Sequence, residues 1–587
     1  MGFRSPRLVT ALLISAGVFA GRKDTVINKV SILIVTYNCH FVYTFIGRAE
    51  RAMQSEPKIA VVGGGIAGMM AALRLAHEGF DTTLFEGADR LGGKIRTETF
   101  SAGHIDAAID CGPTVFSLKP LFEQMFDHLG HTFDSLVKTN PEKLLARHYW
   151  ENENGDVDQL DLFADLDQST DAIGELSGTA DAQAFRSLLG HSRSLFDQLD
   201  HTFMRSTGPN PISLVASLPF MGLPLLAKAR PWQSVWSYLK GCFADPRLVQ
   251  LFARYSTYCG GNPMKTSALL LLVLEAEMAG LWSLDGGIAS LARAMETLLR
   301  ANGVTIKTGQ PIERILTKGR SVCGVQFADG GQSKFDKVVW AGDVSAAASI
   351  LPPELQSKAP TPVRAKERSN SAATLTGVAE LAGVPVANHT VFFSRDYEKE
   401  FAAIERGEIP HDPTLYLNRT QLGSPGSETA AAGFFCIANA RAMQHETTST
   451  VPKDTSSPTS SQDGYWINEE RQQWQSQIEQ KFTSMGLTLN HRAPPVLTLP
   501  QDFAARYPGS GGALFGRAPH GMFASFLRPG LRSKIQGLYF AGGSAHPSAG
   551  LPMAALSGFT AAGAVSKDLA SMKRHYPAGT YGGTSTL

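Results

Sequence analysis

A short apolar run that leads directly into closely spaced glycines constrains this chain more than any other feature. Residues 58–68 read KIAVVGGGIAG. The run at 59–62 is typical of a buried parallel strand, and Gly63-x-Gly65-x-x-Gly68 follows it at once. In this pattern Gly63 permits a tight turn, Gly65 lets the backbone approach a pyrophosphate, and Gly68 lets a helix pack closely on the strand.

The residues after the glycines supply the context that such a motif requires. Apolar side chains recur at Met69, Ala72 and Leu73 and predict a helix, and residues 82–85 (TTLF) predict a second strand. Glu86 ends that strand about 20 residues past the glycines, where a carboxylate accepts hydrogen bonds from a ribose diol. The N-terminus of the helix offers free N–H groups to phosphates. We therefore expect an α/β dinucleotide-binding unit.

A second glycine pair indicates which dinucleotide is bound. Residues 90–97 read RLGGKIRT and contain Arg90, Gly92, Gly93 and Lys94. This segment resembles the E-x3-R-x-G-G-[RK] extension of the FAD-dependent family of amine oxidases, protoporphyrinogen oxidases and carotenoid desaturases. The resemblance implies FAD, with this segment around the pyrophosphate. The family often has Arg at the last position. Lys94 keeps the charge but not the bidentate fork, which Arg96 could supply.

The far end of the chain contains a matching glycine motif. Residues 537–558 read GLYFAGGSAHPSAGLPMAALSG. The run at 538–541 predicts a short strand ending at Gly542 and Gly543, and a helix is expected to begin near Pro552 and Met553. The N-terminus of that helix can stabilise negative charge on a reduced flavin. Two such motifs so far apart predict one discontinuous cofactor domain.

Several blocks narrow the resemblance to carotenoid desaturases, and most closely to 1-hydroxycarotenoid 3,4-desaturases (methoxyneurosporene dehydrogenases). Residues 537–558 resemble the C-terminal signature A-G-x-x-x-H-P-G-x-G-x-P, with Ser548 in place of the usual Gly. Further similar blocks are DCGPTVF at 110–116, RYSTYCG at 254–260, WSLDGG at 282–287, HTVFFSRDY at 389–397 and GALFGR at 512–517. The similarity spans about 58–570. It implies that Gly112, Pro113 and Thr114 bind FAD and that Ile312 lies near the adenine.

These observations predict an α/β fold with a discontinuous Rossmann-type FAD-binding domain and an α+β substrate domain, as in amine oxidases and phytoene desaturases. We expect the FAD-binding domain at 53–115, 280–345 and 505–572, and a substrate or membrane-facing domain at 116–279 and 346–504. Residues 1–52 are interpreted as an N-terminal extension or weak targeting segment, dispensable if the protein begins at Met53. Residues 444–464 are expected to be a flexible insertion and 573–587 a C-terminal tail.

Composition excludes several classes of function. The net charge is +1, which gives no basic field for nucleic acid. Six scattered cysteines without a CxxC pair argue against a disulfide framework or a zinc site, predict no metal, and favour a reduced, cytoplasmic compartment. The uncharged run at 211–227 contains three prolines, so it cannot span a bilayer as one helix. It either lies in the membrane interface, making the protein peripheral, or lines an apolar cavity.

The expected chemistry is removal of two hydrogens from an acyclic carotenoid, with hydride transfer to the flavin. The main hypothesis is formation of the C3–C4 double bond of a 1-hydroxycarotenoid, a hydroxyneurosporene-type substrate. Phytoene desaturation, an amine-oxidase-like reaction and a non-catalytic flavin- or lipid-binding role are the alternatives. The sequence leaves open whether oxygen or a quinone accepts the electrons. It names no catalytic residue: His520, Arg517 and Glu275 lie in matching blocks without an assignable role, and a packed His546 is favoured over a reactive one.

Overall fold

The computed structural model describes residues 57–102, 105–209, 230–422, 431–444 and 468–575. The expectations for residues 1–52 and for the run at 211–227 lie outside these ranges, as do those for most of the insertion at 444–464 and for the tail beyond 575. The described residues from Lys58 onward form one compact unit. The predicted domain boundaries within it therefore stay predictions.

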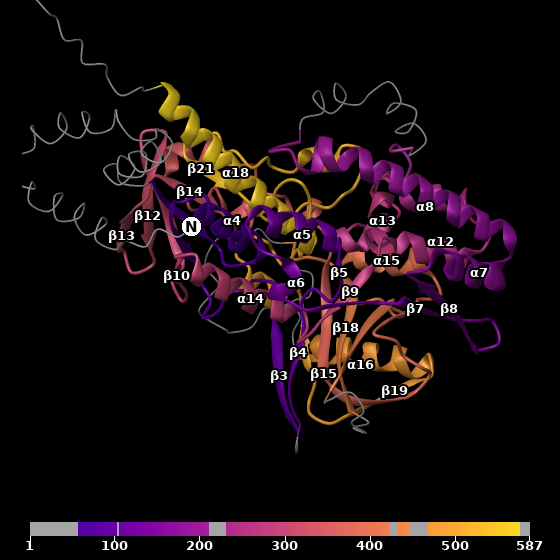
Figure 1. Cartoon of the computed structure of the whole chain (residues 1–587). Helices are drawn as coiled ribbons and strands as arrows, with labels where there is room; N and C mark the ends of the chain where they lie inside the picture. The colour runs from indigo at the N-terminus through magenta and orange to yellow at the C-terminus, as the bar shows by residue number, and fades with distance from the viewer. Residues whose placement is uncertain (1–56, 103–104, 210–229, 423–430, 445–467, 576–587) are drawn as a thin grey trace, which may run out of the picture. The chain divides into compact units, whose positions relative to one another are not determined.

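A parallel five-stranded sheet forms the first layer of this unit (Figure 1). Its strand order is β10-β2-β1-β14-β21, and its members are β10 (Thr305–Lys307), β2 (Asp81–Phe85), β1 (Lys58–Val62), β14 (Lys337–Trp340) and β21 (Leu538–Phe540). The central strand β1 pairs with β2 on one side and β14 on the other. Residues 59–62 are buried, which explains their continuous apolar run.

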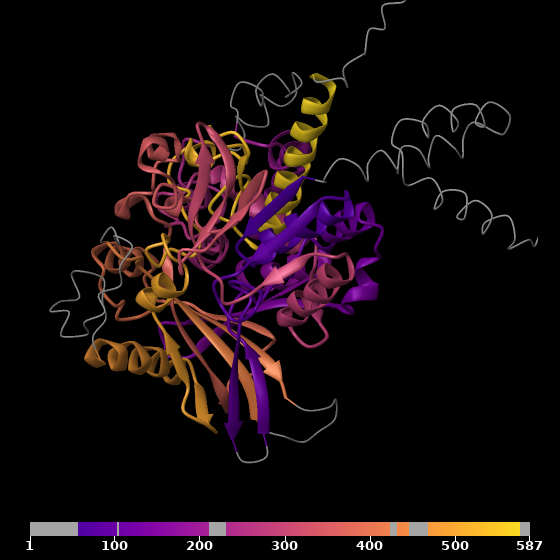
Figure 2. The same ribbon diagram turned by 90° about the vertical axis from the view of Figure 1, so that its left-hand side faces the viewer.

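Helices from opposite ends of the chain pack together beside this sheet. Figures 1 and 2 show the long C-terminal helix α18 (Leu551–His575) running alongside α4 (Ile66–His77). The two helices approach so closely that a Cβ added at Gly558 would lie 1.9 Å from the Ala67 carbonyl oxygen. A third helix, α14 (Ile288–Ala301), buries one apolar face against α4. This assembly matches the predicted discontinuous architecture.

A larger mixed sheet forms the second layer. Its order is β19-β15-β18-β17-β16-β7-β8, and β20 also pairs with β15. All pairs are antiparallel except β16 with β7. The strands are β7 (Leu144–Glu151), β8 (Val157–Phe163), β15 (Ser371–Gly383), β16 (His389–Phe392), β17 (Leu415–Gln421), β18 (Ala431–Ala440), β19 (Leu487–His491) and β20 (Val496–Thr498).

Helices enclose this sheet and build two apolar cores against it. Figure 1 shows α8, α12 and α13 together above the sheet, with α16 beside β19. The helices of this half are α7 (Leu166–Ser177), α8 (Thr179–Leu199), α11 (Val235–Lys240), α12 (Pro246–Ala253), α13 (Val273–Met278), α15 (Tyr397–Arg406) and α16 (Asn468–Ser484). Stacked aromatic rings, such as Trp150 on Phe393 at 4.9 Å between centroids, fill the core on the α8 side.

Small elements connect the two layers. A hairpin of β3 (Thr97–Ala102) and β4 (Ile105–Asp110) ends at a partly buried carboxylate. Asp110 accepts a 2.6 Å hydrogen bond from the Ile288 N–H at the start of α14. Burial raises the pKa of Asp110 to about 6. The remaining elements are β5 (Phe116–Ser117), β6 (Thr139–Pro141), β9 (Leu281–Leu284), β11 (Ile312–Lys318), β12 (Ser321–Phe327), β13 (Gln332–Lys334), α5 (Lys119–His128), α6 (Phe133–Leu136) and α17 (Pro500–Arg506).

Within the described ranges, no helix is both long and apolar enough to cross a bilayer. The same residues contain no cluster of three or more His, Cys, Asp or Glu side chains that could hold a metal ion.

Candidate cofactor and substrate site

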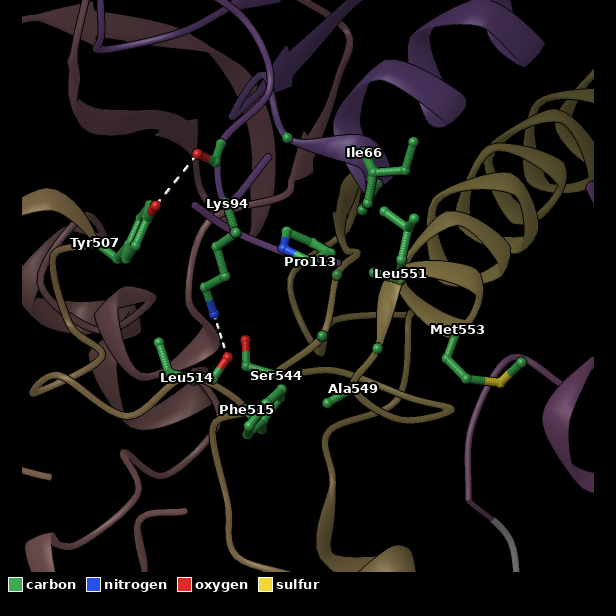
Figure 3. A pocket seen from close by; sticks show the side chains of 18 of the residues that line it. Ile66, Lys94, Pro113, Tyr507, Leu514, Phe515, Ser544, Ala549, Leu551 and Met553 are labelled. Atoms are coloured by element: carbon green, nitrogen blue, oxygen red, sulfur yellow. Dashed lines mark hydrogen bonds between the residues drawn. The ribbon is translucent and has the colours of Figure 1, made fainter. Parts of the chain in front are cut away.

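One cavity of about 1330 Å³ lies between the two layers. Typical ligand pockets measure about 300–1,000 Å³, so this one has room for two large molecules side by side. Figure 3 shows segments from both ends of the chain around it. Among the predicted cofactor-binding residues all but Gly68 line the cavity: Gly63, Gly65, Glu86, Arg90, Gly92, Gly93, Lys94, Gly112, Pro113, Thr114, Ile312, Gly542, Gly543, Pro552 and Met553.

In the first glycine motif, the protein's own backbone requires glycine at two positions but leaves open space at the third. Gly63 has φ +108°, and a Cβ at Gly68 would lie 1.8 Å from the Gly63 carbonyl oxygen, so the protein itself requires both glycines. Gly65 differs, because its φ is −72° and an added Cβ would meet only the Gly93 Cα at 3.9 Å. Since nothing in the chain demands glycine at this cavity-lining position, the space in front of Gly65 fits a ligand that approaches the backbone.

Glu86 closes the end of the cavity nearest the second strand. Its carboxylate accepts hydrogen bonds from the Gly64 N–H at 2.6 Å and the Ala88 N–H at 2.9 Å. Ile312 lines the same cavity, and the Gln310 N–H bonds to the Glu86 carbonyl at 3.0 Å. The Glu86 carboxylate is held by two backbone donors and can accept further hydrogen bonds, which fits a ribose. The apolar Ile312 side chain in the same cavity fits an adenine.

Two cations lie at or behind the wall of the cavity: Lys94 lines it, and Arg528 is buried behind Gly543 and Phe515, which line it. Lys94 Nζ donates to the Leu514 carbonyl oxygen (Figure 3), and burial lowers the pKa of Lys94 although the Asp343 carboxylate opposes the shift. The Arg528 guanidinium donates to the carbonyls of Gly543 at 2.5 Å, Phe515 at 3.0 Å and Arg517 at 3.2 Å. These cations favour an anionic ligand. Arg96, in contrast, pairs with Glu98 at 3.1 Å.

The C-terminal motif presents the start of α18 to the cavity. Leu551, Pro552 and Met553 line it, and Figure 3 shows Leu551 beside Ile66 of the first motif. His546 does not line the cavity. Its Nε2 lies 2.9 Å from the Phe203 carbonyl oxygen and 3.0 Å from Ser206 Oγ, and burial lowers its pKa to about 4. These contacts favour the packed interpretation of His546.

The rest of the cavity is mainly apolar. Its lining there includes Phe196, Leu199, Phe203, Leu269, Leu270, Leu272, Val273, Ala276, Phe435, Ile437 and Phe526. This compartment comes from α8, from the region around α13 and from β18, and so it belongs to the predicted substrate side. A long hydrocarbon is the ligand that such a wall solvates best.

One polar cluster interrupts the apolar wall. Glu277 is buried on α13 and accepts hydrogen bonds from the Tyr258 hydroxyl at 2.5 Å and the Tyr255 hydroxyl at 2.7 Å. Arg254 Nη2 donates to the Tyr258 hydroxyl at 2.9 Å. Burial lowers the pKa of Arg254, but Tyr258 and Glu277 outweigh it and raise that pKa above its usual value. Glu277, Tyr258 and Arg254 line the cavity.

Glu277 was not among the residues predicted from the sequence, and the three candidates without an assigned role lie outside the cavity. Glu275 pairs with Arg193 at 3.1 Å, and Arg517 pairs with Glu367 at 3.1 Å. His520 Nε2 accepts from the Asn262 N–H at 2.9 Å in a separate pocket of about 210 Å³. The quoted block at 254–260 did contain Arg254 and Tyr258, which was the available signal for this cluster.

Comparison with known proteins agrees with this geometry. The family model described as flavin containing amine oxidoreductase matches residues 66–566. The chain is 37% identical over 541 residues to a hydroxyneurosporene desaturase of Rubrivivax gelatinosus, covering 90% of this chain and 97% of that protein. It is 36% identical to a hydroxyneurosporene desaturase of Cereibacter sphaeroides, covering 89% and 100%. An oxidoreductase structure from Methanosarcina mazei has a similar fold, with a TM-score of 0.52, 15% identity and coverage of 86% and 99%.

Proposed function

Because the chain belongs to the flavin containing amine oxidoreductase family, we propose that it is an FAD-dependent carotenoid desaturase that forms the C3–C4 double bond of an acyclic 1-hydroxycarotenoid. One observation carries the proposal: the glycine-lined cradle and a long apolar compartment form a single cavity. A hydride acceptor and a hydrocarbon can therefore meet there. The two desaturases at 36% and 37% identity act, by their names, on hydroxyneurosporene.

The residues of this chain fit FAD along the whole cradle. Gly65 leaves room for the pyrophosphate, Glu86 accepts from the ribose, and Lys94 and Arg528 supply positive charge near the C-terminal motif. FAD, when bound, supplies the two-electron hydride acceptor. The chain's own part is to hold the polyene against the cofactor and to exclude water with its apolar wall.

The alternatives are less well supported. A small amine would leave the long apolar compartment of the cavity unfilled, which argues against an amine substrate. Phytoene has no hydroxyl group, so it would leave the buried polar groups of the cluster without a partner. Both points favour a hydroxylated carotenoid.

Exposed apolar side chains support peripheral contact with a membrane, from which a carotenoid would enter the cavity. Trp232 is 64% exposed, Phe523 62% and Leu527 56%, although large apolar side chains are usually buried. The segments that carry Trp232 and Phe523 both hydrogen-bond to residues 265–268, and the cavity wall begins at Leu269. In a vesicle flotation assay, the double variant Phe523→Ser/Leu527→Ser should bind less than the wild type. Equal binding would contradict the proposed contact.

The enzyme assay feeds 1-hydroxyneurosporene, neurosporene and phytoene separately to the FAD-loaded protein under anaerobic conditions. We expect hydroxyneurosporene to bleach the flavin and to yield a product with red-shifted absorbance, because conjugation lengthens by one double bond. Re-oxidation by oxygen or by a quinone then identifies the electron acceptor. Bleaching by phytoene alone would reassign the protein as a phytoene desaturase.

A further inference from the structure

We propose that Arg254, Tyr258 and Glu277 form the binding site for the terminal tertiary hydroxyl group of the substrate. This inference rests on the proposed function and names the residues that select a hydroxylated carotenoid over its hydrocarbon counterpart. The three side chains are called the hydroxyl-binding cluster below.

The cluster contains charged groups, with which a hydrocarbon cannot form hydrogen bonds. Arg254 is 5% exposed and Glu277 is 3% exposed, and both line a largely apolar wall. Burying a charged pair costs several kcal/mol per ion unless hydrogen bonds complete it. Tyr255, Tyr258 and Glu277 satisfy part of this requirement among themselves.

One donor of the cluster has no partner. Arg254 Nε is buried and has no hydrogen-bond partner, while Nη2 of the same guanidinium is engaged by Tyr258. The Glu277 carboxylate uses one acceptor site on each oxygen and has capacity for more. An alcohol is one donor and an acceptor in a single small group. At this wall it would donate to the Glu277 carboxylate and accept from the Arg254 guanidinium.

The position of the cluster fits the position of the hydroxyl in the substrate. In a 1-hydroxycarotenoid the oxygen is only three bonds from C3, so its binding site must lie close to the reacting carbons. Thr114, in the segment predicted to bind FAD, hydrogen-bonds to the Tyr416 hydroxyl at 2.8 Å. Tyr416 interacts electrostatically with both Arg254 and Glu277. Thr114, Tyr416 and the hydroxyl-binding cluster line the same cavity, so the cluster and the predicted cofactor segment face one space.

The proposed contact explains selectivity by the cost of leaving groups unpaired. A site built to hydrogen-bond a hydroxyl discriminates strongly against the analogue that lacks it, because its polar groups are then buried without partners. The apolar wall by itself would bind the hydroxylated and unhydroxylated chains about equally. Preference for the alcohol therefore requires polar groups in the wall, and the hydroxyl-binding cluster supplies a charged donor and acceptor there.

The test compares Glu277→Gln and Tyr258→Phe with the matched control Glu275→Gln. Glu275 lies on the same helix and is buried to a similar degree, but it pairs with Arg193 outside the cavity. Flavin reduction is followed anaerobically with 1-hydroxyneurosporene and with neurosporene. In the two cluster variants we expect kcat/KM for the hydroxylated substrate to fall about 10- to 100-fold, as for a lost hydrogen bond to a charged group, with little change for neurosporene. The control should retain the wild-type ratio.

A binding measurement separates this inference from the proposed function. Perturbation of the flavin absorbance reports the affinity for an acyclic isoprenoid with a terminal tertiary alcohol and for the same hydrocarbon without it. The wild type and Glu275→Gln should prefer the alcohol, and the cluster variants should lose that preference while keeping their FAD content. Equal losses for both ligands, or an unchanged preference, would overturn the assignment of the cluster. Wild-type flavin that no carotenoid reduces would instead overturn the proposed function.

Discussion

Replacing Gly65 by alanine should separate cofactor binding from folding. Its φ of −72° suits any residue, and the nearest protein atom to the new Cβ would be the Gly93 Cα at 3.9 Å. The apoprotein should therefore stay within about 1 kcal/mol of the wild type, because the restriction of the unfolded chain by alanine opposes its poorer fit at the N-cap of α4. The methyl group would occupy the space through which a pyrophosphate reaches the backbone. Loss of one hydrogen bond to a charged group, worth about 1.5–3 kcal/mol, would weaken FAD binding about 10- to 150-fold.

The assay is fluorescence titration of the apoprotein with FAD, together with denaturant unfolding of the same apoprotein. Gly68→Ala is the contrasting variant, since its Cβ would lie 1.8 Å from a backbone oxygen that cannot move cheaply. It should lower the free energy of unfolding by about 3 kcal/mol or more. Wild-type FAD affinity in Gly65→Ala would refute the assignment of this space to the pyrophosphate. Equal destabilisation by both substitutions would show that Gly65 is a packing residue.

Three further predictions concern ionisable groups. Burial lowers the pKa of His148 to about 3, so the unfolded chain binds more protons than the folded one between about pH 6.5 and 3. The free energy of unfolding should therefore decrease as the pH falls through that window, and His148→Phe should reduce this pH dependence in unfolding experiments. The pKa of Asp110 is raised to about 6, so the folded protein favours the neutral carboxyl group and loses stability as the pH rises from 3.8 to 6. Asp110→Asn removes this charge and should raise the free energy of unfolding at pH 7 by about 1–3 kcal/mol. Arg528→Met should leave three carbonyls without their donor, lower the free energy of unfolding by about 3 kcal/mol or more and reduce FAD content, whereas Arg528→Lys should restore part of both.

The parallel sheet was predictable because its signals are local. A buried run, a glycine turn and a helix follow one another within residues 58–77, so the sequence alone specified β1, α4 and the space between them. The larger sheet was not recognised strand by strand. Its strands pair with segments that are distant in the sequence, as β16 does with β7. Where each strand begins and ends depends on this pairing, which local sequence patterns do not predict.

All but one of the residues predicted to bind the cofactor line one cavity, and their role stays a prediction; the polar cluster was not predicted. Glu275 and Glu277 lie two positions apart on α13, and side chains at that spacing point about 200° apart on a helix. Which of the two faces the cavity depends on how α13 packs, and no sequence motif encodes this. Chemical type alone therefore could not separate the Arg193-paired carboxylate from the one that lines the cavity.

The order β10-β2-β1-β14-β21 also has a consequence for biosynthesis. The last strand leaves the ribosome roughly 480 residues after the first, which at about 5–20 residues per second is roughly half a minute to a minute and a half. Throughout that interval α4 lacks the helix that covers it, and β14, once it has been made, presents an open edge until β21 arrives. A nascent chain must therefore be shielded from neighbouring chains until its final segment arrives, and a message truncated before β21 yields a colourless, aggregation-prone product rather than a weakened enzyme.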